Sequence, residues 1–432
     1  MNKSLKRKCE NISFFLSKIL LKIKLYLCPV KKIAIVGGGA AGYFVAANLG
    51  KTVGQQTILF EQANLPLQKV RISGGGRCNV THACFDPLDL VEFYPRGKKE
   101  LLSVFYTFQP GDTMAWFDER GVELKIEDDN RIFPVSDSSL SIIEALTKAV
   151  DQNKVQLNFS DGVQEINKVD GGYELITKSG KHFFETVIVT TGSTPKFWKS
   201  LKNLGLKIVQ PVPSLFTFNC KDPRIEGLMG ISFDNAEVKI NQQKLEAEGP
   251  LLITHWGFSG PAILRLSAWG ALKLNESNYK FETEINFVNQ SKDEIISFLN
   301  DKKQVDAKKN VHKNNPFDFP KRFWFSILSY CNIDENKVYA DLSKKHIEAI
   351  AIELTQGKYQ INGKSTFKDE FVTAGGVDLK EIDFHSMQAK KIPQLFMAGE
   401  VLNIDAITGG FNFQACWSEG YIISEKIKEI YQ

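Results

Sequence analysis

Cysteine is scarce in this chain, and its cysteines are not arranged in pairs. The seven cysteines among the 432 residues include no C-x-x-C pair; they are Cys9, Cys28, Cys78, Cys84, Cys220, Cys331 and Cys416. Thiols paired at that spacing are typical of structural zinc sites and thioredoxin-type dithiols, so neither is predicted and no metal site is expected. Scattered cysteines, odd in number, agree best with reduced thiols in a cytoplasmic protein.

An uninterrupted apolar run is also missing, even at the N-terminus. Residues 1–30 begin with a basic stretch, and the apolar part that follows is interrupted by Lys18, Lys22 and Lys24. A membrane span needs about 20 mainly apolar residues, and a secretory signal needs an unbroken apolar region with a cleavage site. Two interpretations remain for residues 1–30. One is a basic amphipathic helix on a membrane surface, and the other, which we favour, is an extension outside the fold.

The body of the chain has no excess of positive charge. The formal net charge of +4 comes from residues 1–30, which hold seven Lys and Arg against one Glu; the other 402 residues hold 47 basic and 49 acidic side chains. Nucleic-acid-binding domains usually present a basic surface. A nucleic-acid partner is therefore not expected.

The sequence does contain the pattern of an α/β fold that is divided along the chain. A buried-strand pattern at 31–36, a glycine turn, an apolar helical run at 43–49 and a strand at 57–60 form a βαβ unit. Residues 98–150 are expected to be helical with irregular breaks. Short strands follow up to 184, and 186–191 is another apolar strand.

The middle of the chain has a different character. Short alternating segments between 211 and 285 predict a small antiparallel barrel or sheet, and the residues after 291 have helical patterns. A strand at 394–398 and a helix at 412–428 then resume the α/β pattern of the first part of the chain. The predicted domains are an extension (1–30), a nucleotide-binding domain (31–194 and 371–432), a β-barrel-like insert (195–290 and 354–370) and a helical insert (291–353).

The first chemical motif is Gly37-x-Gly39-x-x-Gly42. Gly37 permits a tight turn, Gly39 lets backbone N–H groups approach a pyrophosphate, and Gly42 allows close packing of helix on strand. The pyrophosphate would lie at the positive end of the helix. An acid, Glu61, follows at the end of the second strand, where it can accept hydrogen bonds from ribose hydroxyls and would repel a 2′-phosphate.

The glycine motif does not separate FAD from NAD, but two distal segments favour FAD. FAD needs support for its ribityl chain and its ring. The strand end at Gly192 and the segment Gly399-Glu400, with Asp405 and Asn412 further on, are suited to this. The Gly409-Gly410 pair would open the last helix, whose positive end would face the flavin edge where negative charge develops on reduction.

Four stretches carry a family resemblance: RISGGGRCNVTH, LLITHWGFSGPAIL, FVTAGGVDL and LFMAGEVLNIDAITGGFNFQACWSEGY. From about Lys31 to the C-terminus the chain resembles the BaiN-like family of NAD(P)/FAD-dependent oxidoreductases, which includes aminoacetone oxidase family FAD-binding enzymes. The resemblance implies a Rossmann-like FAD domain of the two-dinucleotide-binding type, with an inserted β-barrel domain that itself carries a helical insert. It assigns an FAD-binding role to Gly37, Gly39, Ala41, Gly42, Glu61, Arg71, Gly76, Arg77, Cys78, Asn79, Gly192, Gly399, Glu400, Asp405 and Asn412.

Two further segments suggest particular roles. In Gly74–Asn79, three glycines free a backbone path close to a ligand, and Arg77 can neutralise a phosphate or the reduced flavin. We expect Cys78 to pack on the flavin rather than to act as a catalytic thiol. In the insert, His255 is the candidate catalytic residue, as a proton donor to the substrate, with a structural role as the alternative.

The favoured hypothesis is a cytoplasmic FAD-dependent oxidoreductase that passes hydride from NAD(P)H through FAD to an organic substrate held between the domains. No second G-x-G-x-x-G is present, so NAD(P)H would dock transiently over the flavin. The alternatives are an FAD-dependent oxidase of a small amine that uses O₂, and a flavin-binding module without turnover. The expected partner is a small redox substrate, and the protein is expected to be a monomer or a homodimer.

Overall fold

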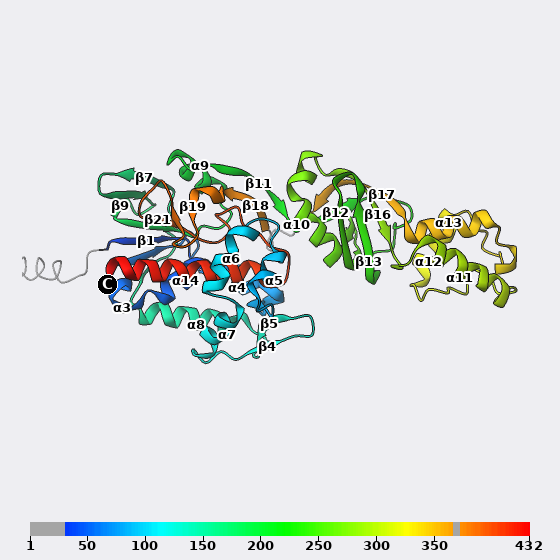
Figure 1. The fold of residues 1–432 in the computed structure, drawn as a ribbon, viewed down its shortest axis with the longest axis horizontal. Coiled ribbons are helices and arrows are strands. Elements are labelled where there is room, and N and C mark those ends of the chain that lie inside the picture. Colours follow the sequence, from blue (N-terminus) through cyan, green and yellow to red (C-terminus); the bar gives the residue numbers. More distant parts are fainter. Residues whose placement is uncertain (1–30, 366–371) are drawn as a thin grey trace, which may run out of the picture.

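The structure is a computed structural model that describes residues 31–365 and 372–432. Figure 1 shows a larger lobe, which holds the C-terminus, and a smaller lobe made of a barrel with a group of helices at its far end. Residues 1–30 lie outside the described residues, so both interpretations of that segment remain untested. Within the described ranges, no helix has the length and apolar character needed to cross a bilayer.

A seven-stranded sheet forms the centre of the larger lobe. The strands lie in the order β19-β20-β21-β10-β1-β2-β6, and from β21 to β6 all neighbours are parallel. Their bounds are β1 Ile33–Val36, β2 Thr57–Phe60, β6 Gln156–Asn158, β10 Thr186–Val189, β19 Ile382–Asp383, β20 Gln388–Ala389 and β21 Leu395–Met397. Strands β1, β2 and β10 are buried along their whole length, as expected for a parallel sheet covered on both faces. The predicted Rossmann-like α/β class is confirmed.

Helices from the two ends of the chain pack together beside this sheet. They are α2 (Ala40–Asn48), α3 (Gly50–Gly54), α8 (Ser139–Gln152) and α14 (Phe411–Tyr431). Both backbone views show α14 running along the larger lobe. The Phe44 ring of α2 lies 5.2 Å from that of Trp417 on α14, and Gly420 permits close approach because a Cβ there would lie 3.2 Å from the carbonyl oxygen of Ala41.

The expectation of a helical region at 98–150 is wrong for its middle part. The helices are α6 (Lys98–Thr107), α7 (Pro110–Asp118) and α8, but β4 (Leu124–Ile126) and β5 (Arg131–Pro134) form a hairpin between α7 and α8. The turn holds Asn130 at a φ of +63°, a conformation that a continuous helix excludes. Strand β3 (Thr81–His82) adds to β5, so the hairpin is fixed by a partner some fifty residues earlier in the chain.

A small sheet and a two-stranded connection complete the larger lobe. The predicted short strands form β7 (Glu165–Val169), β8 (Gly172–Ile176) and β9 (Lys181–Phe184). Helix α9 (Pro195–Asn203) lies beyond the domain end predicted at residue 194, yet its Phe197, Trp198 and Leu201 are part of this lobe's core. Strands β11 (Ile208–Ser214) and β18 (Val372–Val377) then pair where the chain leaves and re-enters the lobe.

The smaller lobe is built on a closed antiparallel barrel, which confirms the predicted barrel. Its order is β12-β15-β14-β13-β16-β17. The bounds are β12 Thr217–Cys220, β13 Ser232–Ile240, β14 Leu245–Ile253, β15 Gly257–Ser259, β16 Lys280–Asn286 and β17 Gly357–Ser365. Helix α10 (Pro261–Glu276), which the strand patterns did not predict, begins at a proline and packs against β14.

Three helices sit between β16 and β17, where the helical insert is predicted. They are α11 (Lys292–Val305), α12 (Lys321–Tyr330) and α13 (Lys344–Thr355). Arg224, from a barrel loop, ties this group to the barrel. Its guanidinium donates to Asp222 at 2.7 Å and to Glu353 of α13 at 2.6 Å, and lies 3.8 Å from the centre of the Tyr359 ring. The Arg224 side chain is only 4% exposed, so its loss would leave carboxylates without a partner in a desolvated place.

We predict that Arg224→Met lowers the free energy of unfolding by about 3–5 kcal/mol, because it leaves two carboxylates without their cation. Denaturant unfolding would measure the change. Arg322→Met is the matched control, since exposed Arg322 donates only one bond of 3.2 Å, to the Gly227 carbonyl, and its loss should cost about 1 kcal/mol or less. Equal stability of the two variants would contradict the role of Arg224.

Candidate FAD site

The carboxyl ends of the parallel strands meet where β1 lies between β10 and β2. The chain moves from β1 to β2 on one side and later places β10 on the other, so this is the topological switch point at which such sheets bind ligands. Gly37 follows β1 with a φ of +113°, and a Cβ there would lie 2.3 Å from the carbonyl oxygen of Thr190. The Thr190 hydroxyl closes the contact by donating to the Gly37 carbonyl at 2.9 Å.

The N-terminus of α2 is open toward this point. Gly39 precedes the helix. In the chain segments that the structure describes, no side chain caps the helix and no atom lies within 4 Å of a Cβ placed on Gly39. Gly42 is the opposite case, because its Cβ would lie 2.1 Å from the carbonyl oxygen of Gly37. Ala41 is buried in the first turn. The free N–H groups and helix dipole can therefore receive a pyrophosphate at Gly39, while Gly42 serves packing.

Glu61 directly follows β2 and stabilises the glycine turn through a hydrogen bond. One of its carboxylate oxygens accepts from the Gly38 N–H at 2.7 Å and the other from the Ala63 N–H at 2.7 Å. Each oxygen keeps acceptor capacity for a ribose hydroxyl. The Leu67 N–H donates to the Gly38 carbonyl, which places α4 (Gln68–Ile72) next to the same turn.

The glycine-rich loop after α4 exposes its backbone. Gly74, Gly75 and Gly76 all have positive φ values, and a Cβ on Gly75 or Gly76 would meet nothing within 4 Å. The Asn79 side-chain amide, oriented to satisfy both neighbours, accepts from the Gly410 N–H at 3.1 Å and donates to the Thr81 carbonyl at 3.0 Å. The loop therefore lies against the start of α14, more than 300 residues later in the sequence.

The two arginines of this segment differ. Nε of Arg71 is buried and has no hydrogen-bond partner among the described residues, which fits a donor that awaits a ligand. Arg77 is already engaged: it donates to Glu127 at 2.6 Å and lies 3.9 Å from the centre of the Phe133 ring on the β4–β5 hairpin. Arg77 therefore holds the hairpin against the loop instead of offering a free charge.

Gly399 and Glu400 bring the end of the chain to the same place. Gly399 has a φ of +78°, and a Cβ on it would lie 3.5 Å from that of Ala41. Glu400 pairs with Lys69 at 2.6 Å. Beyond the end of the adjacent strand β10, Gly192 has a φ of +60° with open space at its Cβ position, and the neighbouring Thr191 hydroxyl is buried without a partner among the described residues.

Asp405 and Asn412 contact protein groups rather than open space. Fully buried Asp405 binds Arg96 through two short hydrogen bonds and accepts from Ser214 of β11 at 2.8 Å. Burial raises the pKa of Asp405, which Arg96 opposes. Asn412 makes two hydrogen bonds to the backbone of Ala406. Both residues hold the chain around the site through these contacts, and their FAD-binding role remains a prediction.

The cysteines of the described ranges are all free thiols. Burial raises the pKa of Cys78 to about 12, so its thiol stays protonated and is a poor nucleophile near neutral pH. This agrees with the prediction that Cys78 packs rather than reacts.

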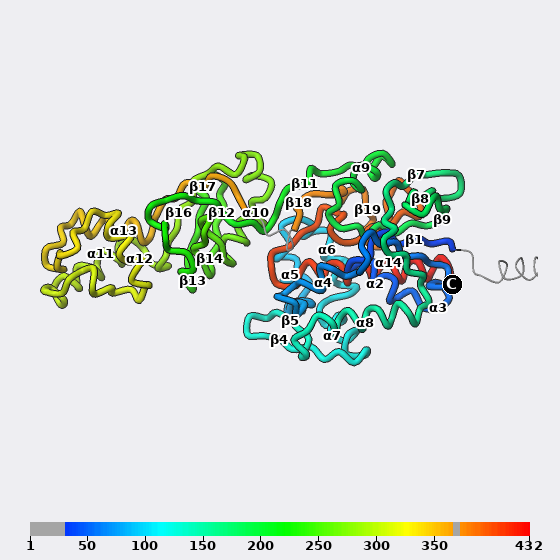
Figure 2. Tube along the Cα trace, turned by 180° about the vertical axis from the view of Figure 1, so that it is seen from behind, coloured from blue at the N-terminus to red at the C-terminus, as the bar shows by residue number. Residues whose placement is uncertain are grey.

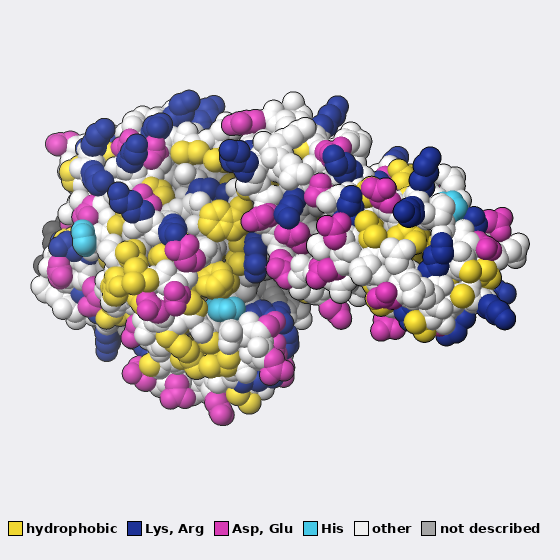
Figure 3. Space-filling model, turned by 45° about the vertical axis from the view of Figure 1, so that its right-hand side comes forward, with side chains coloured by type: hydrophobic (Ala, Val, Ile, Leu, Met, Phe, Trp, Pro, Cys, Tyr) yellow, Lys and Arg dark blue, Asp and Glu magenta, His cyan; other side chains and the backbone are white. Residues whose placement is uncertain are grey.

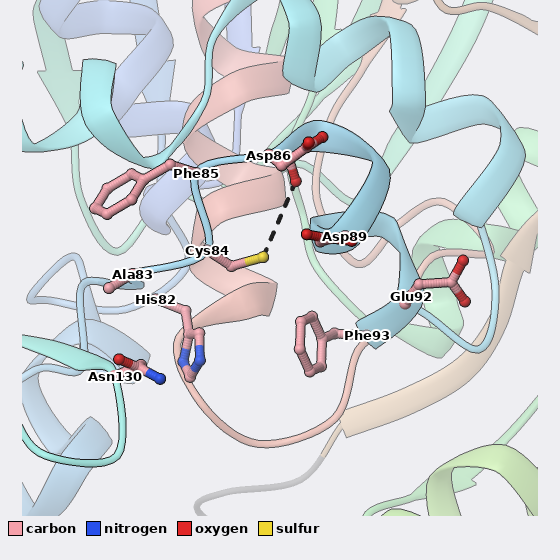
Figure 4. Close-up of a pocket in the computed structure, with 9 residues that line it drawn as sticks. All are labelled: His82, Ala83, Cys84, Phe85, Asp86, Asp89, Glu92, Phe93 and Asn130. Carbon is pink, nitrogen blue, oxygen red and sulfur yellow. Dashed lines mark hydrogen bonds between the residues drawn. The ribbon is translucent and has the colours of Figure 1, made fainter.

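His82, which the sequence analysis missed as a functional candidate, lines a pocket of about 490 Å³ beside the start of α14. Figure 4 shows His82 and Phe93 side by side at the pocket, with ring centres 5.7 Å apart. Nδ1 of His82 lies 3.2 Å from the Gly409 carbonyl oxygen, and burial lowers the pKa of the imidazole. The sequence did offer one indication of a role for His82, because it is the last residue of the family-like stretch RISGGGRCNVTH.

His255 lies elsewhere. It is exposed on the turn between β14 and β15, and its neighbour Trp256 accepts from Cys220 through the backbone. The Ile253 carbonyl before this turn accepts from Gly230, in the barrel loop whose Gly227 carbonyl binds Arg322 of α12. The turn is thus on the side of the helical insert, and the proton-donor role of His255 remains a prediction.

FAD fits the residues that are brought together. We call them the cradle, and they are the turn Gly37–Gly42, Glu61, the loop 71–79, Gly192 and Gly399-Glu400. Three observations on the described part of the chain carry the fit: the open space at Gly39, Gly75, Gly76 and Gly192, the unpaired Nε of Arg71, and the unpaired hydroxyl of Thr191. FAD can bind the α2 N-terminus with its pyrophosphate and Glu61 with its adenosine ribose.

We predict that Gly39→Ala keeps the fold but loses FAD, because a methyl group would occupy the space that the pyrophosphate needs. Gly42→Ala should instead lower the free energy of unfolding by about 1–3 kcal/mol through its clash with Gly37. Thermal unfolding and the flavin content of the purified variants measure the two effects. Full flavin content in Gly39→Ala would contradict this geometry.

Comparison with known proteins agrees with the site. The model of the family described as HI0933-like protein Rossmann domain matches residues 31–426. The chain is 25% identical over 405 residues to a ribosomal RNA dihydrouridine synthase of Escherichia coli, covering 91% of this chain and 97% of the relative. It is 24% identical over 424 residues to a 3-dehydro-bile acid delta(4,6)-reductase of Clostridium scindens, covering 93% and 100%.

A solved structure shares the fold at much lower identity. The 3-ketosteroid-delta4-(5alpha)-dehydrogenase of Rhodococcus jostii has a TM-score of 0.50 and 11% identity, with 93% of this chain and 97% of that chain covered. The family match spans nearly the whole described chain, and the cradle holds the features that FAD needs. The chain therefore belongs to the HI0933-like Rossmann family, the group to which BaiN-like proteins belong, and is an FAD-dependent oxidoreductase.

Proposed function

We propose that the protein is a reductase that adds hydride and a proton across a carbon–carbon double bond conjugated to a carbonyl. The observation that carries the proposal is the pair of full-length relatives, one named for dihydrouridine synthesis and one for delta(4,6) reduction of a 3-dehydro-bile acid. Dihydrouridine is uridine with one ring double bond saturated beside a carbonyl, and the Δ4 and Δ6 bonds are conjugated to the 3-oxo group. Both reactions therefore have the same electronic pattern.

Such a reduction needs a hydride donor, a place for negative charge and a proton. Bound FAD would supply the hydride after receiving it from NAD(P)H. The start of α14 at Gly410 presents the positive end of a 21-residue helix. Arg71 adds a buried N–H without a protein partner in the described chain. These groups can stabilise charge on a reduced cofactor.

His82 is the residue that we propose for the proton. Its Nδ1 contact with the Gly409 carbonyl favours a hydrogen on that nitrogen, which leaves Nε2 as the atom that would take up a proton from solvent and pass it to a ligand. The Phe411 ring packs against the imidazole with its centre 4.4 Å away, and Phe93, stacked on Phe411, lies 5.7 Å away, so the imidazole is held in place. The protonated carbon would be the one next to the substrate carbonyl.

Two classes of substrate are candidates for this reaction, RNA and a small neutral ring compound. The name of the Escherichia coli relative points to RNA, whereas positive and negative side chains are interspersed over the face drawn in Figure 3, and the chain beyond residue 30 has two more acidic than basic residues. A broad electrostatic attraction to a polyanion is therefore not built into the body of the protein. A local RNA contact and a small neutral ring both agree with this charge distribution.

We expect NADH or NADPH to bleach the visible flavin absorption in anaerobic mixing, and an acceptor of the proposed type to restore it. The two acceptors to compare are a uridine-containing rRNA transcript, read by mass spectrometry for dihydrouridine, and a 3-oxo-Δ4 steroid, read by loss of its conjugated absorption. A flavin that is bleached by a small amine and reoxidised only by O₂ would overturn the proposal in favour of an amine oxidase.

For His82→Phe we expect kcat to fall by about 10²–10⁴-fold, because the phenyl ring keeps the aromatic packing but cannot transfer a proton. Flavin content and the rate of flavin bleaching by NAD(P)H should stay the same. His182→Phe, in β9 of the same lobe, is the matched control and should keep wild-type turnover. If His82→Phe loses flavin, then the residue is structural and the proton comes from elsewhere.

A further inference from the structure

A carboxylic acid is buried beneath the cradle with one oxygen unused. Glu419 of α14 is fully buried, and its Oε2 accepts a 2.6 Å hydrogen bond from the Gly399 N–H. Its Oε1 has no hydrogen-bond partner among the described residues. Buried carboxylates usually have a cation or several donors, so this arrangement calls for a physical reason.

The position of Glu419 connects both halves of the cradle. Gly399 begins the turn after β21 and precedes Glu400. A Cβ on Gly399 would lie 3.3 Å from the sulfur of Cys416 and 3.5 Å from the Cβ of Ala41, in the first turn of α2. The hydrogen bond from Gly399 to Glu419 therefore fixes the C-terminal turn against the helix end that receives the pyrophosphate.

Within residues 31–365 and 372–432, no positive charge acts directly on Glu419. The titratable groups that face it are Cys416 on its own helix and Tyr94, which lies just before α6. The two charges of the Glu400–Lys69 pair act on Cys416 in opposite directions, Glu400 raising and Lys69 lowering the pKa of its thiol. Among the described residues Glu419 forms no ion pair. Burial raises the pKa of Glu419 to about 8, which the Gly399 N–H opposes only in part, so the acid is neutral near pH 7.

We propose that Glu419 is a positioning residue for FAD: as a neutral acid it holds the Gly399-Glu400 turn in the shape that receives the cofactor, and its ionisation weakens FAD binding. The ionised form would place an uncompensated carboxylate against the Gly399-Glu400 turn, next to the helix end that would receive the anionic pyrophosphate. This inference concerns cofactor binding and is independent of the substrate.

The expected pH dependence follows from proton linkage. FAD adds negative charge nearby, so the FAD complex keeps the proton of Glu419 to a higher pH than the flavin-free protein does. Below pH 8 both forms carry the proton, and the affinity is constant. Above pH 8 the flavin-free protein has lost it, so binding must take up a proton. The Kd should rise about tenfold between pH 7 and pH 9.

The test compares FAD binding by flavin-stripped wild-type protein and Glu419→Gln, measured by flavin fluorescence from pH 6 to pH 9. Glutamine keeps an oxygen for the Gly399 N–H and places an NH₂ where the acid has its OH, but it cannot ionise. We expect its Kd to stay flat to pH 9. Glu425→Gln is the matched control, because Glu425 is partly exposed on the same helix and pairs with Lys428 at 2.5 Å; it should behave as wild type.

An equal alkaline weakening in wild type and Glu419→Gln would overturn the proposal, and so would a wild-type Kd that is flat to pH 9. If Glu419→Gln does not fold, then calorimetry on wild type in buffers of different ionisation enthalpy decides. FAD binding at pH 8.5 should take up most of one proton, and binding at pH 6.5 almost none. No uptake at pH 8.5 would refute the role of Glu419.

Discussion

Hydrogen bonds between the segment 79–82 and the last helix close the larger lobe around its cofactor site. The hydroxyl of Thr81 donates to Gln414 at 2.6 Å, and the indole of Trp417 donates to the Val80 carbonyl at 2.9 Å. The Tyr94 hydroxyl donates to the carbonyl of Phe411 at the first turn of α14. These hydrogen bonds are buried, so breaking one would leave a donor or acceptor without a partner and away from water, which costs free energy. They fix the start of α14 beside the glycine-rich loop, and the open backbone of that loop is useful only in this position.

A second buried group governs how the barrel meets the larger lobe. Arg96 binds Asp405 and also donates to the Ala268 carbonyl of α10 at 2.6 Å, while Ser214 of β11 donates to the same carboxylate. One ion pair thus contacts the C-terminal segment, the connecting strand and the barrel helix. Because the pair is desolvated, its geometry resists displacement, and the barrel is held against the site side of the larger lobe.

The parts that the sequence predicted are those with local causes. The turn at Gly37–Gly42 depends on backbone contacts a few residues apart, and Glu61 follows directly from the strand pattern. The β4–β5 hairpin was missed because β3 stabilises it from a distance. The family resemblance assigned Arg77 and Asp405 to the cofactor, and that role remains a prediction; their protein partners could not be read from the sequence, because Glu127 and Arg96 lie 50 and 309 residues away. Nothing in the sequence indicated a role for Glu419, since only its burial in the structure distinguishes it from the other acidic residues of its helix.

The division of the sheet has a consequence for synthesis. Strand β10 pairs with β1 on one side and with β21 on the other, and residues 190–394, which include both inserts, separate β10 from β21 along the chain. Until those residues have been synthesised, the edge of β10 that faces β21 has no partner, and the start of α14 follows later still. Flavin binding must therefore wait until synthesis has passed both inserts, and a nascent chain that stalls before β21 would expose a strand edge prone to association.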